Sequence, residues 1–434
     1  MRALYDVYKF FSLTQNDLFC NTSYPYHPYF FKEYVSKDDI MRNVEHLSFY
    51  FHIPFCKTLC KFCEYTRFLI ENHNTEQQYL DLLEEQVVSY LSTHKIKKIY
   101  GLDIGGGTPS CLSEKGLQRL FSIKDLVTQD VFFVEDFDSS FEFNYETITD
   151  EKISLIAGNG ISRISTGIQV YDNMMMKKHN RRMSKIEEMA KANETFRKEG
   201  IKKINLDIMY GFSKQTDKML EQTLEVIKIL NPDHVTVYEM RYNMNHLAHH
   251  SITRESLYHQ YEYLYYGLLE LNYQARFGQN TFSKYDDEGV SSYLRYRMKK
   301  GIPYKGFGIS AQSMSCNGIT YNSLKSNKSS TMPDIRKIKE EDIYSLPPEE
   351  VVAKYISIAL YNGSFDCEVV DNILGCDSTK YYHQEFAFLL EQEYIELVNK
   401  VVFVTKKGFK YYGAIASLFW SSSHQNKYLR GGIR

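Results

Sequence analysis

The sequence predicts an α/β fold, in which strand and helix units form an open or closed barrel and a small winged-helix-like unit follows at the C-terminus. Two observations predict it. Between residues 47 and 242, short apolar stretches alternate with amphipathic helical ones. Residues 347–434 then combine a helical pattern with a hairpin pattern and a further helix.

Six short apolar stretches are the candidate strands, and helical patterns lie between them. The helix expected at residues 185–199 follows Ser184, and Glu187 three residues later would complete a capping box. Loops at the C-terminal ends of such strands are where α/β sheets place their chemistry. The strands are expected at residues 47–55, 98–104, 140–144, 163–169, 203–209 and 234–240, with another helix at 76–92.

The rest of the chain divides by composition. Residues 253–272 form a helical pattern, and the polar, Ser/Lys/Asn-rich stretch 317–342 is expected to be a long surface connection. A helix at 347–361 and a hairpin at 394–405 follow. We therefore expect an N-terminal extension (1–44), a main catalytic domain (45–316), a connecting segment (317–346) and a C-terminal domain (347–434).

Composition excludes several classes of protein. With 43% hydrophobic and 24% charged residues, the 434-residue chain is not expected to be disordered or fibrous. Its net charge of −2 gives no global attraction to nucleic acid or to an anionic membrane, and the lysine-rich stretch 322–339 is interpreted as a solvated loop. The sequence holds no apolar run of spanning length and no secretory signal, so we expect a cytoplasmic protein without a nucleic-acid or membrane partner.

Three cysteines crowd into the loop after the first predicted strand. Cys56, Cys60 and Cys63 have the spacing CxxxCxxC, which lets three thiolates approach one soft metal centre. A structural zinc site would need a fourth ligand, and no neighbouring His or Cys in the sequence supplies it. His52, upstream on the strand beside Tyr50 on the same face, is interpreted as a packed polar residue rather than a ligand.

Four segments in order extend this motif into a longer resemblance. They are YFHIPFCKTLCKFC (50–63), GGGTPS (105–110), STGIQVYD (165–172) and INLDIMYGF (204–212). Together they resemble the HemN-like subgroup of the radical S-adenosylmethionine (SAM) superfamily, which contains oxygen-independent coproporphyrinogen III oxidases, HemW haem chaperones and class C methyltransferases. The resemblance covers about residues 45–315, and the C-terminal tail is similar to the subgroup's small final domain. It implies a partial (β/α)6 radical SAM barrel with additional strands.

The resemblance also implies the cofactors. A 4Fe–4S cluster held by Cys56, Cys60 and Cys63 would leave one iron open to SAM. One electron from the cluster would split SAM into methionine and a 5′-deoxyadenosyl radical, which removes hydrogen from a substrate carbon. Subgroup members are also similar in placing a second SAM beside the first.

Further residues are assigned to SAM by position in the resemblance. The glycines of GGGTPS allow a close backbone approach to a ligand, and the resemblance implies that Gly106, Gly107 and Thr108 contact the methionine part. Arg181 would pair with its carboxylate, with Arg182 as a competing candidate. The remaining expected contacts are Tyr50, Phe62, Glu142, Gln169 and Asp207, and a second SAM pocket would draw on Tyr238, Glu239, Phe307 and Gln312.

Departures from the family pattern bear on the substrate. Cys63 is followed by Glu64 and Tyr65 rather than by a further cysteine two positions on, as in typical coproporphyrinogen oxidases, and the HNxxYW-like stretch of typical HemW proteins is absent. The main hypothesis is therefore C-methylation or cyclopropanation of a planar sp2-carbon substrate with a second SAM. The alternatives are a coproporphyrinogen oxidase-like or haem-modifying enzyme and a HemW-like chaperone. The expected partners are a planar heteroaromatic or tetrapyrrole substrate and an electron donor such as flavodoxin or ferredoxin.

Overall fold

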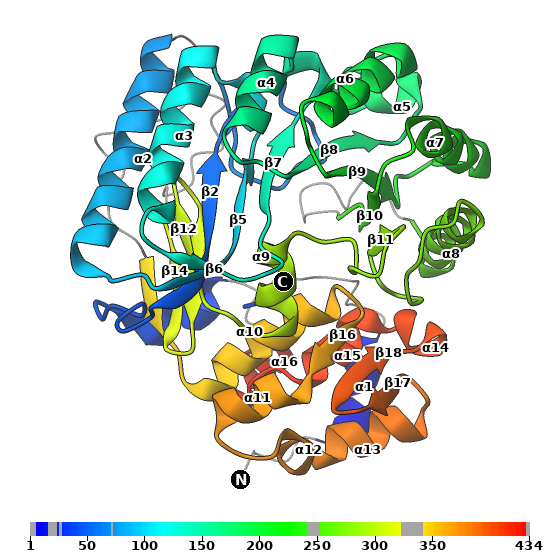
Figure 1. The fold of residues 1–434 in the computed structure, drawn as a ribbon. Coiled ribbons are helices and arrows are strands. Elements are labelled where there is room, and N and C mark those ends of the chain that lie inside the picture. The colour runs from blue at the N-terminus through cyan, green and yellow to red at the C-terminus, as the bar shows by residue number, and fades with distance from the viewer. Residues whose placement is uncertain are drawn as a thin grey trace.

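A computed structural model describes residues 6–15, 24–25, 28–70, 73–241, 252–322 and 342–430 of the chain. Its centre is a curved sheet with six parallel strands in sequence order, as the sequence predicts (Figure 1). The six strands are β2 (His46–Ile53), β5 (Lys98–Gly106), β7 (Ser139–Phe143), β8 (Arg163–Gln169), β9 (Lys203–Tyr210) and β10 (His234–Glu239).

Helices cover the outer face of this sheet, and several of them begin at a residue whose side chain caps the helix. Ser113, for example, accepts a hydrogen bond from the Gly116 backbone N–H and so caps the helix that follows β5. These outer helices are α2 (His73–Thr93), α3 (Glu114–Thr128), α4 (Asp150–Gly158), α5 (Asn173–Lys178), α6 (Ile186–Lys198), α7 (Asp217–Leu230) and α8 (Arg254–Glu270), whereas α9 (Ser292–Lys299) lies on the inner side. None of the helices in the described ranges is long and apolar enough to cross a membrane.

Side chains alternate between the two faces of the strands with a period of two. On β7, for example, Phe141 and Phe143 are buried in the core against the helices, whereas Ser140 and Glu142 face the interior of the curved sheet. Most of the interior-facing positions are polar, in contrast to the apolar outer positions. They include Tyr50, His52, Asp103, Ser140, Glu142, Arg163, Ser165, Asn205, Asp207, Thr236 and Tyr238.

Additional strands extend both edges of the sheet. β12 (Tyr304–Phe307) pairs parallel to β2, and β13 (Gln312–Ser315), β14 (Gly318–Tyr321), β15 (Asp342–Ser345) and β1 (Val35–Ser36) continue antiparallel. β11 (Thr281–Ser283) pairs with β10 at the other edge, and β6 (Phe132–Phe133) pairs with β5.

Two expectations from the sequence need correction. The stretch 317–342 is not wholly a surface connection, because β14 and the start of β15 belong to the sheet and the side chains of Ile319 and Thr320 are buried. Four-residue strands are too short for their alternation to stand out from a polar background, and residues 323–341 lie outside the described part. The helix expected after Ser184 begins one residue later, because Glu188, not Glu187, accepts a hydrogen bond from the Lys185 N–H at 3.3 Å.

The C-terminal residues form a helix, a strand, three short helices and a hairpin in that order, an arrangement similar to a winged helix. Its strands pair in the order β16 (Ser364–Asp366), β18 (Val401–Val404) and β17 (Ile395–Val398). The helices are α10 (Pro348–Leu360), α11 (Cys367–Leu374), α12 (Ser378–Tyr381), α13 (His383–Glu391), α14 (Lys406–Phe409), α15 (Tyr412–Leu418) and α16 (Ser422–Leu429). The N-terminal helix α1 (Val7–Thr14) packs into the same apolar cluster. The predicted boundaries of the four segments stay a prediction.

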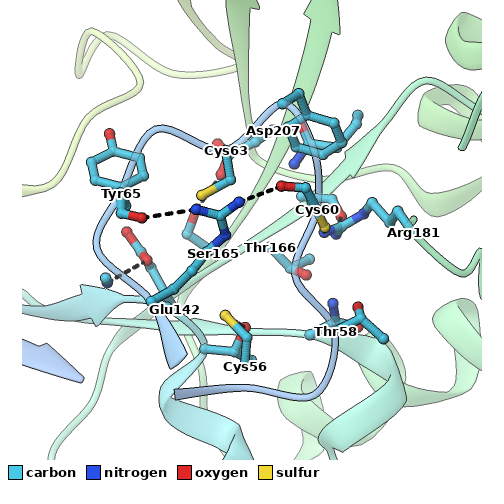
Figure 2. A pocket seen from close by; sticks show the side chains of 18 of the residues that line it. Cys56, Thr58, Cys60, Cys63, Tyr65, Glu142, Ser165, Thr166, Arg181 and Asp207 are labelled. Carbon is cyan, nitrogen blue, oxygen red and sulfur yellow. Dashed lines mark hydrogen bonds between the residues drawn. The ribbon is translucent and has the colours of Figure 1, made fainter. Parts of the chain in front are cut away.

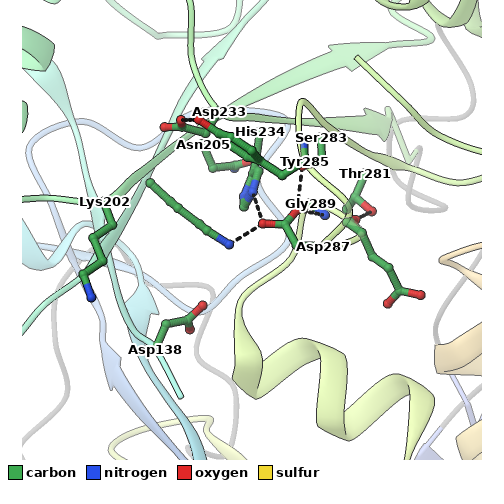
Figure 3. Close-up of polar contacts among 12 residues, drawn as sticks. Asp138, Lys202, Asn205, Asp233, His234, Thr281, Ser283, Tyr285, Asp287 and Gly289 are labelled. Carbon is green, nitrogen blue, oxygen red and sulfur yellow. Dashed lines mark hydrogen bonds and ion pairs between the residues drawn. The ribbon is translucent and has the colours of Figure 1, made fainter. Parts of the chain in front are cut away.

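A partly buried ionic network fixes the segment that connects β11 to α9 (Figure 3). Asp287 accepts hydrogen bonds from Lys203, from His234 and from the Ser283 hydroxyl, and its carboxylate also contacts the Gly289 N–H at 3.2 Å. These contacts connect the start of β9 and β10 to the turn before α9. The network therefore positions α9, which reaches the interior of the sheet.

Candidate active site

The three cysteines lie in the loop that follows β2, at the C-terminal end of the strand. The loop runs from β3 (Phe55–Cys56) to β4 (Phe68–Leu69), which pair with each other. The Lys61 N–H donates to the His179 carbonyl, and the Asn180 side chain donates to the Leu59 carbonyl. The turn after α5 thereby holds the cysteine loop in place.

All three thiols border one cavity (Figure 2). Cys56 and Cys60 are buried and Cys63 is half-buried. Burial raises the pKa of Cys56 to about 12 and also raises the pKa of Cys63. A thiolate at these positions therefore needs positive charge nearby, and a bound metal centre supplies it.

The glycine turn after β5 lies directly against the cysteine loop. The Gly107 N–H donates to the Ile53 carbonyl at 2.8 Å, and the Thr108 N–H donates to the Phe55 carbonyl at 2.7 Å. Gly106 has a φ of +114°, and a Cβ there would lie 2.6 Å from the His52 ring. The glycines are thus required for close approach to protein neighbours, as well as leaving backbone groups open to a ligand.

Two carboxyl groups face the cavity from β7 and β9. Glu142 accepts a hydrogen bond from the Gly106 N–H at 3.0 Å. Burial within the barrel, together with the nearby Asp207, raises the pKa of Glu142 to about 7, although water in the cavity still reaches the side chain. Burial raises the pKa of Asp207 to about 6, while the Asn205 amide donates to its carboxylate at 2.7 Å. In their ionised form, both carboxylates can accept hydrogen bonds from hydroxyl or ammonium groups of a ligand.

A bulge at the end of β8 aims Gln169 into the cavity. Its φ of +61° and the register shift between Gly167 and Gln169 re-orient the strand end. Arg181 donates to the Gly167 carbonyl and lies 3.6 Å from the Cys60 sulfur. Arg182 instead has a 78% exposed side chain, 3.6 Å from Glu146. The structure thus brings Arg181, and not Arg182, to the cavity.

The predicted residues distribute over two adjoining cavities. The cysteine cavity has a volume of about 230 Å³, and the larger one, inside the sheet, about 490 Å³. The two share several wall residues, including Glu142, Asp207 and Tyr238. The predicted residues on the cysteine cavity are Cys56, Cys60, Phe62, Cys63, Gly106, Gly107, Thr108, Glu142, Gln169, Arg181, Asp207, Tyr238 and Glu239.

Three predicted residues lie elsewhere. Tyr50 and Gln312 line the larger cavity rather than the cysteine cavity. Phe307 lines neither of the two, because it stacks on Phe49 at 5.8 Å in the core between the sheet and α2. His52 is buried and contacts the Thr66 carbonyl at 3.2 Å, and burial lowers its pKa to about 4, which agrees with its interpretation as a packed polar residue.

Sequence reasoning missed several residues on the cavity walls. Arg67 donates to the carbonyls of Cys60 and Tyr65, and its charge offsets part of the rise that burial causes in the pKa of Cys63. In the sequence, the only indication of this role is that Arg67 lies four residues after the third cysteine. Cys111 also lines the cysteine cavity, although it is distant from the triplet in the sequence. Tyr361 at the end of α10 lines both cavities.

The chemistry of the donors fits an iron–sulfur cluster with an attached ligand. Within the described ranges, no group of three or more His, Cys, Asp or Glu side chains is close enough to hold a metal ion together. A cubane cluster does not require that, because each thiolate binds a different iron. Beyond the sulfurs, the same cavity offers an arginine, two carboxyl groups and the glycine turn, which match the carboxylate, hydroxyl and ammonium groups of SAM.

Three kinds of comparison with known proteins all find similarity to radical SAM proteins. The radical SAM superfamily model matches residues 50–227. The haem chaperone HemW of Lactococcus lactis is 26% identical over 377 residues, which cover 84% of this chain and 94% of that protein. An oxygen-independent coproporphyrinogen III oxidase of Salmonella typhimurium is 26% identical over 386 residues, covering 83% of this chain and 82% of that protein.

A solved structure shares the fold. It is coproporphyrinogen III oxidase (HemN) from Escherichia coli, described as a radical SAM enzyme, and it matches with a TM-score of 0.71 at 23% identity over 86% of this chain and 90% of that one. The motif, the cavity and these relatives agree. The protein therefore carries a radical SAM domain, with a 4Fe–4S cluster and SAM as its cofactors, and is a relative of the HemW and oxygen-independent coproporphyrinogen III oxidase proteins.

Proposed function

We propose that this protein is a radical SAM enzyme that acts on a carboxylate-bearing tetrapyrrole, as an oxygen-independent coproporphyrinogen III oxidase does. The observation that carries the proposal is the larger cavity, which shares a wall with the cysteine cavity. A substrate there lies next to the place where SAM is expected. The cluster and SAM together supply a carbon radical, and the substrate needs only to present a hydrogen at the shared wall.

In this proposal, different residues of the chain bind the cluster and SAM. Cys56, Cys60 and Cys63 hold the cluster, and Arg181 binds the SAM carboxylate through its planar guanidinium. Phe62 packs beside the cavity against Phe212 at 5.8 Å, a position suited to the adenine ring. The remaining SAM contacts are Gly106, Gly107, Thr108, Glu142, Gln169 and Asp207.

The walls of the larger cavity support a substrate that carries flat aromatic rings, as the pyrrole rings of a tetrapyrrole are. Tyr50 stacks on Tyr293 with the ring centroids 5.9 Å apart, and Tyr304 and Tyr361 border the same space. Aromatic walls bury flat apolar surface with little loss of side-chain freedom. The relatives' names include coproporphyrinogen III oxidase and haem chaperone, both of which concern tetrapyrroles.

A HemW-like chaperone is the second candidate. It is favoured by the 94% coverage of the Lactococcus protein and by Glu64 and Tyr65, which stand where typical oxidases carry a further cysteine. The comparisons support these two tetrapyrrole alternatives better than C-methylation or cyclopropanation with a second SAM, which was the main hypothesis from the sequence. A flavodoxin or ferredoxin as electron donor remains an expectation.

One experiment separates the candidates. Anaerobically reconstituted protein is incubated with SAM, dithionite and coproporphyrinogen III, and the products are followed by mass spectrometry. The oxidase proposal predicts 5′-deoxyadenosine together with a tetrapyrrole that has lost carbon dioxide. A chaperone would bind added haem with a shifted Soret band and give no altered tetrapyrrole, and C-methylation would give S-adenosylhomocysteine and a heavier product. Absence of the decarboxylated product under conditions that cleave SAM would contradict the proposal.

A further inference from the structure

Two cationic side chains enter the larger cavity from different parts of the fold. Arg297 comes from α9, and Lys354 comes from α10 of the C-terminal unit. Neither borders the cysteine cavity. Lys354 is only 4% exposed, and the charge of Arg297 nearby adds to its burial in lowering its pKa to about 7. A permanently charged arginine and a lysine that is about half protonated at pH 7 therefore share one cavity.

Neither cation has an acidic partner in the described part of the chain. The Arg297 guanidinium donates to the Tyr293 hydroxyl at 3.2 Å and lies over the Tyr304 ring, 4.1 Å from its centroid, while its Nε is buried without a hydrogen-bond partner. Lys354 makes no ion pair and no hydrogen bond there. Buried charges are normally paired, because an unpaired one has lost its hydration without compensation.

The acidic groups of the cavity are already engaged with other cations. Arg163 lies among Asp103, Glu142 and Asp207, and its charge lowers the pKa of each of them. Burial, with Asp138 nearby, still raises the pKa of Asp103 to about 8, so that this carboxyl is largely neutral at pH 7. The fourth acid on the walls, Glu64, pairs with Arg241 at 3.5 Å. None of them neutralises Arg297 and Lys354.

We propose that Arg297 and Lys354 form a carboxylate-binding subsite that anchors the substrate of the proposed enzyme through one of its acidic side chains. The inference rests on the proposed function for the identity of the substrate, but the subsite itself rests on the two unpaired buried cations. A carboxylate placed between them would accept hydrogen bonds from both, with the Tyr304 hydroxyl, buried and without a partner, as a further donor.

The subsite gives the C-terminal unit a role in substrate binding. Ile358 and Tyr361 follow Lys354 on the same side of α10 and border the same cavity. The α10 helix therefore supplies a charge, an aliphatic wall and an aromatic wall to a space otherwise formed by the sheet and α9. Anchoring a remote carboxylate there would orient the reacting part of the substrate towards the cavity shared with SAM.

The test compares binding of coproporphyrin III, which carries carboxylates, with binding of its tetramethyl ester. Holoprotein is prepared as wild type, Arg297→Gln, Lys354→Met and the control Lys124→Met, since Lys124 is likewise a buried lysine but lies on α3, 3.0 Å from the Asn159 carbonyl. Loss of one charge-assisted contact is expected to weaken coproporphyrin III binding by about tenfold to a hundredfold in either cavity variant. The affinity for the tetramethyl ester should be the same in wild type and both cavity variants. The control Lys124→Met should bind both ligands as wild type does.

A structural role for the two cations predicts a different pattern. Removing an unpaired buried charge should leave the thermal midpoint of Lys354→Met equal to or above that of wild type, and the cluster absorption unchanged. If Lys354→Met lowers the thermal midpoint as well as the affinity for coproporphyrin III, Lys354 has a structural role and the subsite proposal is wrong. Equal coproporphyrin III affinity in wild type and both variants would overturn it as well.

A second probe separates this inference from the proposed function. Benzoate, a carboxylate on one ring, should raise the thermal midpoint of wild type and not of either variant, whereas neutral benzamide should have no effect. If wild type binds no coproporphyrin III but benzoate behaves as stated, the tetrapyrrole assignment fails and the subsite stands. If benzoate stabilises wild type and the variants equally, or stabilises none of them, the subsite is wrong.

Discussion

Arg181 is expected to control SAM binding, and its neighbour Arg182 provides the matched control. Arg181 donates to the Gly167 carbonyl and approaches the Cys60 sulfur at 3.6 Å, which leaves its remaining N–H groups for a carboxylate in the cavity. A hydrogen bond to a charged group contributes about 1.5–3 kcal/mol. Arg181→Ala should therefore raise the dissociation constant of SAM by about 10- to 150-fold.

The assay is a titration of SAM against the absorption or magnetic resonance spectrum of the reconstituted cluster. Arg181→Lys should bind SAM with intermediate affinity, because it keeps the charge but not the planar fork. Arg182→Ala should stay within about twofold of wild type, since that side chain is mostly exposed and lies by Glu146. A variant pair in which Arg182→Ala weakens SAM binding and Arg181→Ala does not would refute the assignment.

Four further predictions concern the site and its scaffold. Gly106→Ala should destabilise the fold by about 1–3 kcal/mol in denaturant titrations and reduce SAM binding, because of its positive φ and the His52 ring, whereas Gly158→Ala, in helix α4 with open space around it and no positive φ, should cost less. SAM affinity should fall as the pH drops below about 7, because Glu142 then becomes protonated, and Glu142→Gln should give a flatter pH profile in the same titration. Burial lowers the pKa of His234 below its unfolded value of about 6.5, so its contribution to stability is complete above that pH and is lost as the pH falls further. Asp287→Asn should lower the free energy of unfolding by about 1–3 kcal/mol at pH 7, because the partly buried Lys203 loses its charged partner; a loss below about 0.5 kcal/mol would contradict the role of this network.

Much of the fold could be predicted because its signal is local and periodic. The parallel strands each contain enough residues for alternation to be recognised, and polar positions such as Glu142 and Asp207 stand out between apolar neighbours. The chain's order places their ends at one edge of the sheet, where the cysteine triplet also lies. The short strands β14 and β15 lack such a signal, because β14 has only three buried positions among polar neighbours and β15 has none.

The rest of the site depends on packing between distant segments. Cys111 reaches the cysteine cavity through the turn after β5, and Lys354 reaches the larger cavity from a helix that in the sequence belongs to the C-terminal unit. Neither residue has a motif around it. Similarly, the choice between Arg181 and Arg182 depends on the conformation of the turn after α5, which adjacent residues in a sequence do not reveal.

The most direct test of the central claim measures iron, sulfide and 5′-deoxyadenosine in protein prepared anaerobically with SAM and dithionite. Wild type and the control Cys316→Ala, at an exposed thiol, should contain about four irons and four sulfides and release 5′-deoxyadenosine. Cys60→Ala should keep its circular dichroism spectrum and lose both the cluster and the nucleoside product. Wild-type protein that takes up no iron under these conditions, or a Cys60→Ala variant that still produces 5′-deoxyadenosine at the wild-type rate, would contradict the account.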